Sequence, residues 1–138
     1  LDKDSEGLLL MTNNGELLNK IMRAGNFHEK EYLVEIDRNV TRTFTERMQE
    51  GVYLKELDVT TRPCRVNKTG ERQFSIVLTQ GLNRQIRRMC QALGCKVVSL
   101  KRIRIMNVEL GDLPSGEYRE LSDREIDTLY QMTRKSRS

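Results

Sequence analysis

The sequence is poor in the residues that build metal sites and disulfide frameworks. Its 138 residues include no tryptophan, one histidine and three cysteines, and the cysteines form no Cys-x-x-Cys pair. A single histidine and an odd number of dispersed cysteines argue against a His/Cys zinc site. Reduced thiols in the cytosol are the simpler interpretation, so we expect a cytoplasmic protein.

Long apolar runs and glycine-rich phosphate loops are also missing. No stretch approaches the ~20 apolar residues that cross a bilayer, and we expect no membrane partner. Without a phosphate loop or a cluster of metal ligands, we expect neither a metal nor another cofactor. No internal repeat or low-complexity tract is present, and the length suits one domain.

The charge is mildly positive and unevenly distributed. Lys and Arg number 24 against 20 Asp and Glu, which gives a net charge of +4. A small net charge is only a weak pointer to nucleic acid, but its clustering says more. Arg84, Arg87 and Arg88 fall within one short segment, and Lys101, Arg102 and Arg104 fall within another.

Hydrophobic periodicity predicts an α+β fold. Helices are expected at 16–23, 43–50 and 83–93, and a last helix should begin with a capping box of Ser122 and Glu125. Strands are expected at 8–11, 30–37, 73–79 and 96–110, with a turn at 67–70. Because the strands lie mostly in hairpin order, we predict a largely antiparallel mixed sheet with flanking helices. Residues 1–132 would form the domain and 133–138 a disordered basic tail.

The helix at 83–93 has two distinct faces. Asn83 is expected to cap its start. The buried stripe follows helical spacing at Ile86, Met89, Cys90 and Leu93, while the arginines at 84, 87 and 88 gather on the opposite face. Planar guanidinium groups bind phosphates in bidentate geometry, so this face predicts RNA binding.

A second basic segment lies on the predicted strand that follows. Alternation predicts that Arg102 and Arg104 share a face with Leu100 and Met106. Arginines between apolar residues suggest the floor of a cleft under a sugar-phosphate backbone.

The acidic segment at the start of the sequence has two interpretations. Asp2, Asp4, Glu6 and Gly7 match the first positions of a calcium-binding EF-hand loop, but Asn13 stands where a bidentate Glu is required. In the second interpretation these residues form an acidic loop before an apolar strand, and the loop holds a carboxylate at the start of that strand.

Three ordered motifs together resemble the pseudouridine synthases, in particular the branch that acts on bacterial ribosomal RNA. The likeness runs from Leu1 to about Tyr130. The first motif is Leu1-Asp2 followed by Ser5-Glu6-Gly7-Leu8-Leu9, the second is Lys30-x-Tyr32, and the third is Gly81-Leu82-Asn83-Arg84-Gln85-Ile86-Arg87-Arg88-Met89.

The resemblance implies roles for individual residues. Asp2 is the expected catalytic carboxylate, Tyr32 the aromatic that stacks on the flipped target base, and Arg87 the partner of Asp2. Leu100 is the expected apolar residue beneath the tyrosine. The residues expected to contact RNA, the last four of them on charge alone, are Lys30, Asn83, Leu100, Arg84, Arg88, Arg102 and Arg104.

The implied activity is the isomerisation of a specific uridine to pseudouridine in large-subunit ribosomal RNA, with transfer RNA as a further candidate substrate. The family's opening catalytic segment and its small S4-type RNA-binding domain would lie upstream of this chain, which we expect to be a monomer. A carboxylate could attack C1′ or C6 of the target nucleotide, or the reaction could pass through a glycal, and the sequence leaves both routes open. A non-catalytic RNA-binding module is the main alternative function, and a calcium-binding protein is a more distant one.

Overall fold

The computed structural model describes residues 1, 3–23 and 26–136. Its strands are β1 (Glu6–Gly7), β2 (Lys30–Ile36), β3 (Tyr53–Leu54), β4 (Val59–Thr60), β5 (Arg65–Gly70), β6 (Gln73–Leu78), β7 (Val97–Ile105) and β8 (Val108–Glu109). Its helices are α1 (Gly15–Met22), α2 (Arg42–Glu50), α3 (Gln85–Ala92) and α4 (Asp123–Thr133). None of these helices is both long and apolar enough to cross a membrane.

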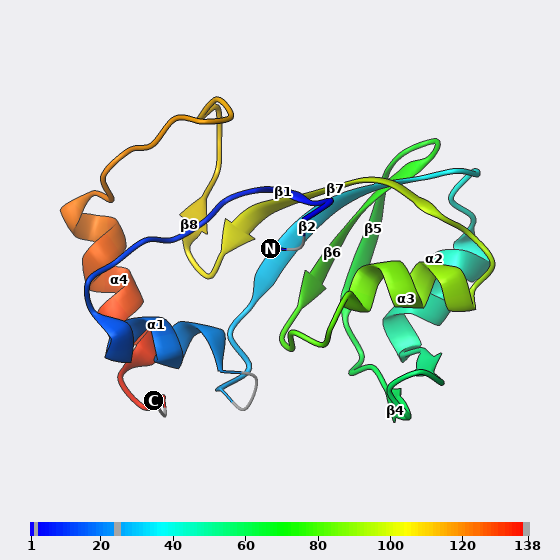
Figure 1. Ribbon diagram of the computed structural model, residues 1–138, viewed down its shortest axis with the longest axis horizontal. Helices are drawn as coiled ribbons and strands as arrows, with labels where there is room; N and C mark the ends of the chain where they lie inside the picture. Colours follow the sequence, from blue (N-terminus) through cyan, green and yellow to red (C-terminus); the bar gives the residue numbers. More distant parts are fainter. Residues whose placement is uncertain (2, 24–25, 137–138) are drawn as a thin grey trace.

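One mixed sheet organises the molecule. Its strand order is β1-β7-β2-β6-β5, with β8 paired to β7, and β3 with β4 forms a separate hairpin. Only the β1–β7 pair is parallel among the strand pairs of the described residues. Figure 1 shows α1 and α4 at one end of this sheet and α2 and α3 at the other. The predicted α+β fold with a largely antiparallel mixed sheet is confirmed.

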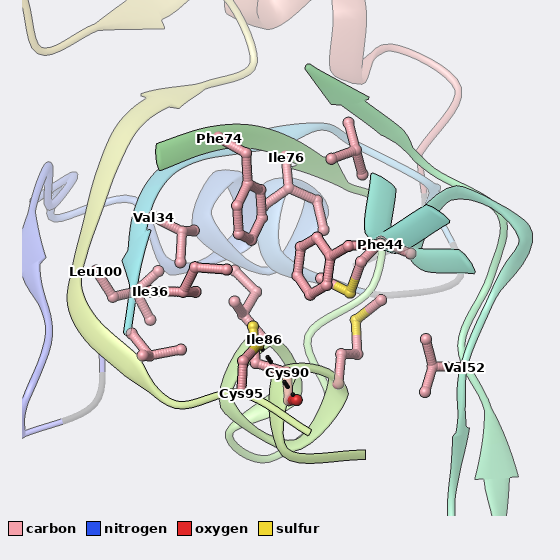
Figure 2. Close-up of a cluster of buried hydrophobic side chains, with 14 of the residues drawn as sticks. Val34, Ile36, Phe44, Val52, Phe74, Ile76, Ile86, Cys90, Cys95 and Leu100 are labelled. Carbon is pink, nitrogen blue, oxygen red and sulfur yellow. Dashed lines mark hydrogen bonds between the residues drawn. The ribbon is translucent and has the colours of Figure 1, made fainter. Parts of the chain in front are cut away.

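Two hydrophobic clusters lie along the sheet. The larger one joins β2, β6 and β7 to α2 and α3, and Figure 2 shows Phe44 of α2 facing Phe74 of β6 within it. Their rings meet edge to face, with centroids 5.3 Å apart. The smaller cluster contains Ile21 of α1, Ile105 of β7 and Leu129 of α4.

The space between the two clusters falls on one face of β2 and β7. Leu100 belongs to the larger cluster and Ile105 to the smaller one. Leu100 pairs with Val34, Arg102 with Tyr32, and Ile105 with Lys30. Paired residues in a sheet point to the same face. The polar residues of these pairs therefore stand together between two apolar regions.

Helix starts follow the local signals in the sequence. Asn14 Oδ1 accepts from the Leu17 amide at 3.1 Å, and Thr41 Oγ1 accepts from the Phe44 amide at 3.1 Å. Ser122 and Glu125 form both bonds of the predicted capping box. The helices predicted at 16–23 and 43–50 are confirmed to within a residue or two, because these bonds satisfy the free amides of the first turn.

Two predicted elements are wrong. The strand expected at 8–11 is replaced by β1 at Glu6–Gly7, after which Leu8 is buried while Leu9 and Met11 are 62% and 92% exposed. The turn expected at 67–70 is part of β5. The real turn comes at Glu71 and Arg72, whose carbonyls accept from the amides of Val40 and Ile36 at 2.8 and 2.9 Å. These bonds to the β2–α2 connection favour the later turn.

The division into a domain and a tail at residue 133 stays a prediction, but α4 crosses that boundary. Thr133 is 2% exposed, and its hydroxyl donates to the Leu129 carbonyl at 2.8 Å. Ser136 Oγ lies 2.6 Å from His28 Nε2. Thr133 is thus buried on α4, and Ser136 contacts a residue that precedes β2. Residues 137 and 138 lie outside the described part of the chain.

Gly7 is required by the approach of β1 to β7. Its φ is +117°, and a Cβ there would lie 2.3 Å from the Arg102 carbonyl oxygen and 2.4 Å from the Arg102 amide nitrogen. Because both neighbours are backbone atoms of the central sheet, neither can move without breaking strand pairing.

We therefore expect Gly7→Ala to lower the free energy of unfolding by about 2–4 kcal/mol. Gly15→Ala is the matched control, because a Cβ at Gly15 meets no atom within 4 Å. That control should stay within about 1 kcal/mol of the parent protein. Urea unfolding of the three proteins measures both changes, and equal stability of the two variants would contradict the packing argument.

Candidate active site

A pocket of about 300 Å³ opens where the two hydrophobic clusters separate. Its floor comes from β2 and β7, and its wall comes from the start of α3 and the segment before it. The described residues that line it are Leu1, Ser5, Met22, Lys30, Tyr32, Leu78, Gln80, Gly81, Leu82, Asn83, Arg84, Gln85, Ile86, Arg87, Leu100 and Arg102.

The pocket is positively charged. Four of the described lining residues are cationic, namely Lys30, Arg84, Arg87 and Arg102, and none of those described is acidic. Charges of one sign around a concave, low-dielectric surface concentrate the field inside it. The arrangement therefore favours an anionic ligand.

Two of these cations form the floor beside Tyr32. Arg102 is 5% exposed, and its Nε donates to the Leu8 carbonyl at 2.9 Å. Lys30 is 6% exposed, and its ammonium donates to the carbonyls of Ile21 and His28 at 3.0 and 3.2 Å. Burial, together with the nearby charge of Arg102, lowers the pKa of Lys30 to about 8. Lys30 therefore still carries its proton at neutral pH.

The wall carries two more cations close to the acidic loop. Arg87 Nη2 donates to the Asp4 carbonyl at 2.9 Å and to Ser5 Oγ at 3.4 Å. Arg84 Nη2 lies 3.8 Å from the Asp4 carboxylate. The buried Nε of Arg87 has no hydrogen-bond partner among the described residues. An unpaired buried N–H group costs free energy, so this atom is suited to an acceptor that occupies the site.

Asn83 does not cap α3 as expected. The N-cap is Arg84, whose φ is +48° and whose side chain makes no capping bond. Asn83 is instead bound twice by Arg88, since Arg88 Nη2 donates to Asn83 Oδ1 at 2.8 Å and Arg88 Nε donates to the Asn83 carbonyl at 2.9 Å. The Asn83 oxygen that would accept from the helix is occupied by this contact.

Arg104 lies apart from the pocket because β7 contains a bulge. Glu31 pairs with Arg104 but Tyr32 pairs with Arg102, so one extra residue of β7 lies between these pairs. A bulge reverses the alternation of side chains. Arg104 therefore faces away from Arg102, and the prediction that they share a face is wrong. Its guanidinium binds Glu31 at 2.9 Å and Glu29 at 3.1 Å.

The structure brings together most of the predicted site residues. Tyr32, Arg87 and Leu100 line the same pocket, as do Lys30, Asn83, Arg84 and Arg102. Arg88 and Arg104 are not among the described lining residues. Asp2 lies outside the residues that the structure describes, although Leu1 and Ser5 on either side of it line the pocket.

Two glutamines that line the pocket were not predicted as site residues from the sequence. Gln80 Oε1 accepts from the Arg62 amide at 2.8 Å and from Gln85 Nε2 at 3.3 Å. Gln85 is 5% exposed, and its Oε1 accepts from the Leu82 amide at 3.2 Å. Both residues belong to or directly precede the third motif. The half-buried Gln80 and the buried Gln85 thus place two amides at the pocket wall.

Comparisons with known proteins agree with this geometry. The family model described as RNA pseudouridylate synthase matches residues 1–92. The chain belongs to this family. It is 51% identical over 138 residues to the dual-specificity RNA pseudouridine synthase RluF of Escherichia coli K12, covering all of this chain and 47% of that protein.

Two further relatives extend the likeness. Ribosomal large subunit pseudouridine synthase B of Pseudomonas aeruginosa is 36% identical over 133 residues, which cover 94% of this chain and 34% of that protein. A crystal structure of a pseudouridylate synthase superposes with a TM-score of 0.89 at 34% identity, covering 94% of this chain and 56% of the other. This chain thus spans about half the length of relatives such as RluF.

The buried ammonium of Lys30 predicts a pH-dependent stability. The folded-state pKa is about 8 against an ordinary value of 10.5, so burial penalises the charged lysine at every pH below 8. Between these values the folded protein releases the proton while the unfolded chain keeps it. The parent protein should therefore gain stability relative to Lys30→Met as the pH rises from 8 to 10.

Urea unfolding at several pH values between 7 and 10 measures this difference. Lys55→Met, which removes an exposed lysine, is the control. A difference between parent and Lys30→Met that is flat with pH, or that matches the control, would contradict the burial of a charged ammonium.

Proposed function

We propose that this chain forms the catalytic site of an enzyme that converts a uridine of RNA to pseudouridine. The supporting observation is the pocket that joins Tyr32, Arg87 and three further cations beside the acidic loop, in a member of the RNA pseudouridylate synthase family. A cationic pocket with an aromatic floor suits a nucleotide lifted out of a polyanion.

The reaction is an isomerisation and needs no external group. The N1–C1′ bond of uridine breaks, the base turns, and C5 forms the new bond to C1′. C5 loses its proton and N1 regains one, so atoms and electrons balance. Asp2 would serve either as the nucleophile or as the base of the glycal route.

Asp2 is the proposed catalytic carboxylate. Its neighbours Leu1 and Ser5 line the pocket, and Arg87 binds the loop that follows it through Asp4 and Ser5. The Nε of Arg87, which has no hydrogen-bond partner among the described residues, would be a donor to this carboxylate. A nearby guanidinium favours the ionised form of an acid, which both routes require.

Tyr32 is the proposed stacking partner of the target base. Flipping a nucleotide out of its stack costs a few kcal/mol, and stacking on an aromatic ring returns about 1–3 kcal/mol. Leu100 extends the apolar surface beside it. The amide oxygens of Gln80, Gln85 and Asn83 already accept protein hydrogen bonds, so these residues would shape the pocket wall around the base.

Arg84, Lys30 and Arg102 are the proposed partners of the phosphates next to the target. Arg88 and Asn83, which bind each other, would present a combined polar surface at the rim. The contact of Arg104 with RNA is the least supported of these predictions, because two carboxylates already neutralise its charge.

The proposed substrate is large-subunit ribosomal RNA. The name of the Pseudomonas relative supports it, and transfer RNA stays a second candidate. An upstream S4-type domain, a monomeric state, a cytoplasmic location and the lack of a cofactor are predictions that rest on the resemblance and composition.

We expect Asp2→Ala in the full-length protein to lower the rate of pseudouridine formation at least about 1,000-fold while RNA binding survives. Asp4→Ala is the matched control, since it removes an acid from the same loop but leaves the backbone carbonyl that Arg87 binds. Mapping of pseudouridine in ribosomal RNA after derivatisation with a carbodiimide, which distinguishes pseudouridine from its isomer uridine, measures the product. RNA binding without any product from the parent protein would favour the non-catalytic module instead.

Arg84→Ala should weaken RNA binding and reduce the slope of log K against log salt by about 1, because one phosphate contact is lost. Arg72→Ala is the control: its guanidinium lies on the β5–β6 turn, where it donates to Asn39, and outside the pocket lining. Fluorescence anisotropy at several salt concentrations gives both slopes. Identical slopes for the two variants would remove Arg84 from the RNA path.

A further inference from the structure

We propose that Phe27 and Arg62 form a stacking platform for the base of a nucleotide adjacent to the target uridine. This inference rests on the proposed function, because it needs an RNA strand that enters the pocket. It assigns a binding site to two residues that lie outside the pocket lining.

Phe27 is an exposed aromatic in an unusual backbone conformation. Its φ is +57° and it is 57% exposed. Positive φ is rare for a bulky aromatic residue, and such conformations persist where the surroundings or a function require them. This backbone leaves much of the Phe27 residue accessible to a ligand.

Arg62 covers one face of the Phe27 ring. Its guanidinium carbon lies 4.0 Å from the ring centroid. Arg62 is itself held in place, since Nη1 donates to the Thr79 carbonyl at 3.0 Å and the backbone amide donates to Gln80 Oε1 at 2.8 Å. The cation–π contact therefore fixes Phe27, which precedes β2, to the segment between β4 and β5.

Hydrogen bonds connect the pair and its neighbour His28 to two residues that line the pocket. Gln80, which accepts from the Arg62 amide, lines the pocket. Lys30, another lining residue, binds the carbonyl of His28, the residue after Phe27. If the target uridine of an RNA strand occupies the pocket, a neighbouring nucleotide of that RNA would thus pass Phe27 and Arg62.

Base flipping creates the need for such a surface. When the target uridine leaves its stack, the adjacent base loses a stacking partner. An aromatic ring backed by a guanidinium supplies a new flat partner for any base, and the positive charge suits the phosphate beside it. A structural role alone explains the Arg62 contact but not why the aromatic stands so exposed at the pocket rim.

The test uses the full-length protein and a stem-loop from large-subunit ribosomal RNA. One probe carries 2-aminopurine on the 5′ side of a loop uridine and a second carries it on the 3′ side. In the parent protein, binding should quench one of the two probes through stacking. Phe27→Leu should abolish that quenching and weaken binding about 5- to 100-fold, whereas Phe27→Tyr should restore both.

Turnover and a control variant separate this role from others. Phe27→Leu should raise KM and leave kcat unchanged, because the platform does not touch the reacting base. Tyr118→Leu is the control, because Tyr118 is 88% exposed and lies in the β8–α4 connection, at the opposite end of the sheet from β4 (Figure 1). It should bind and quench as the parent does. A thermal melt of each variant checks that the fold is retained.

Two outcomes would overturn the proposal. One is parent protein that binds at saturation without quenching either probe, and the other is Phe27→Leu that binds and quenches as the parent does. Failure of the proposed function is a separate result, because it appears as missing pseudouridine in the parent protein while the binding measurements still report on stacking.

Discussion

Arg102 holds the N-terminal segment against the central sheet with both its backbone and its side chain. Its carbonyl accepts from the Leu8 amide at 2.8 Å, and its Nε donates to the Leu8 carbonyl at 2.9 Å. On the other edge of β7, Arg102 pairs with Tyr32. Arg102 thus brings the acidic loop and the aromatic floor together beside its own positive charge. Gly7 permits the close approach of β1 to β7.

The pocket is where positive charge collects without acidic neighbours in its described lining. By contrast, Arg104, which faces away from the pocket, is paired with Glu31 and Glu29. This difference affects ligand binding, because an anionic ligand stabilises a buried or half-buried cation that lacks a counter-ion. The fold therefore concentrates four cations next to the acidic loop, and of these Arg84 lies 3.8 Å from the Asp4 carboxylate.

Features that depend on neighbouring residues were predicted correctly from the sequence, whereas several that depend on contacts between distant segments were not. The capping box at Ser122 was predicted, and the helices expected from residues 16 and 43 begin one residue earlier, because helix starts depend on bonds within a few residues. The apolar run after Gly7 looked like a strand, but pairing with β7 ends at Gly7 in the structure. Asn83 has the right chemistry for a cap, yet Arg88 takes its oxygen. Such competition between partners is decided by three-dimensional packing.

The sequence by itself determined the family, the fold class and seven of the sixteen described residues that line the pocket, because these depend on short motifs and on periodicity. Only the tertiary structure showed that Arg102 and Arg104 lie on opposite faces of the sheet, because β7 contains a bulge between them. Neither the composition nor the spacing of the sequence predicts this bulge. It also brought Phe27 onto Arg62 from distant loops. Contacts of this kind arise from strand register and loop closure, which local residue patterns leave open.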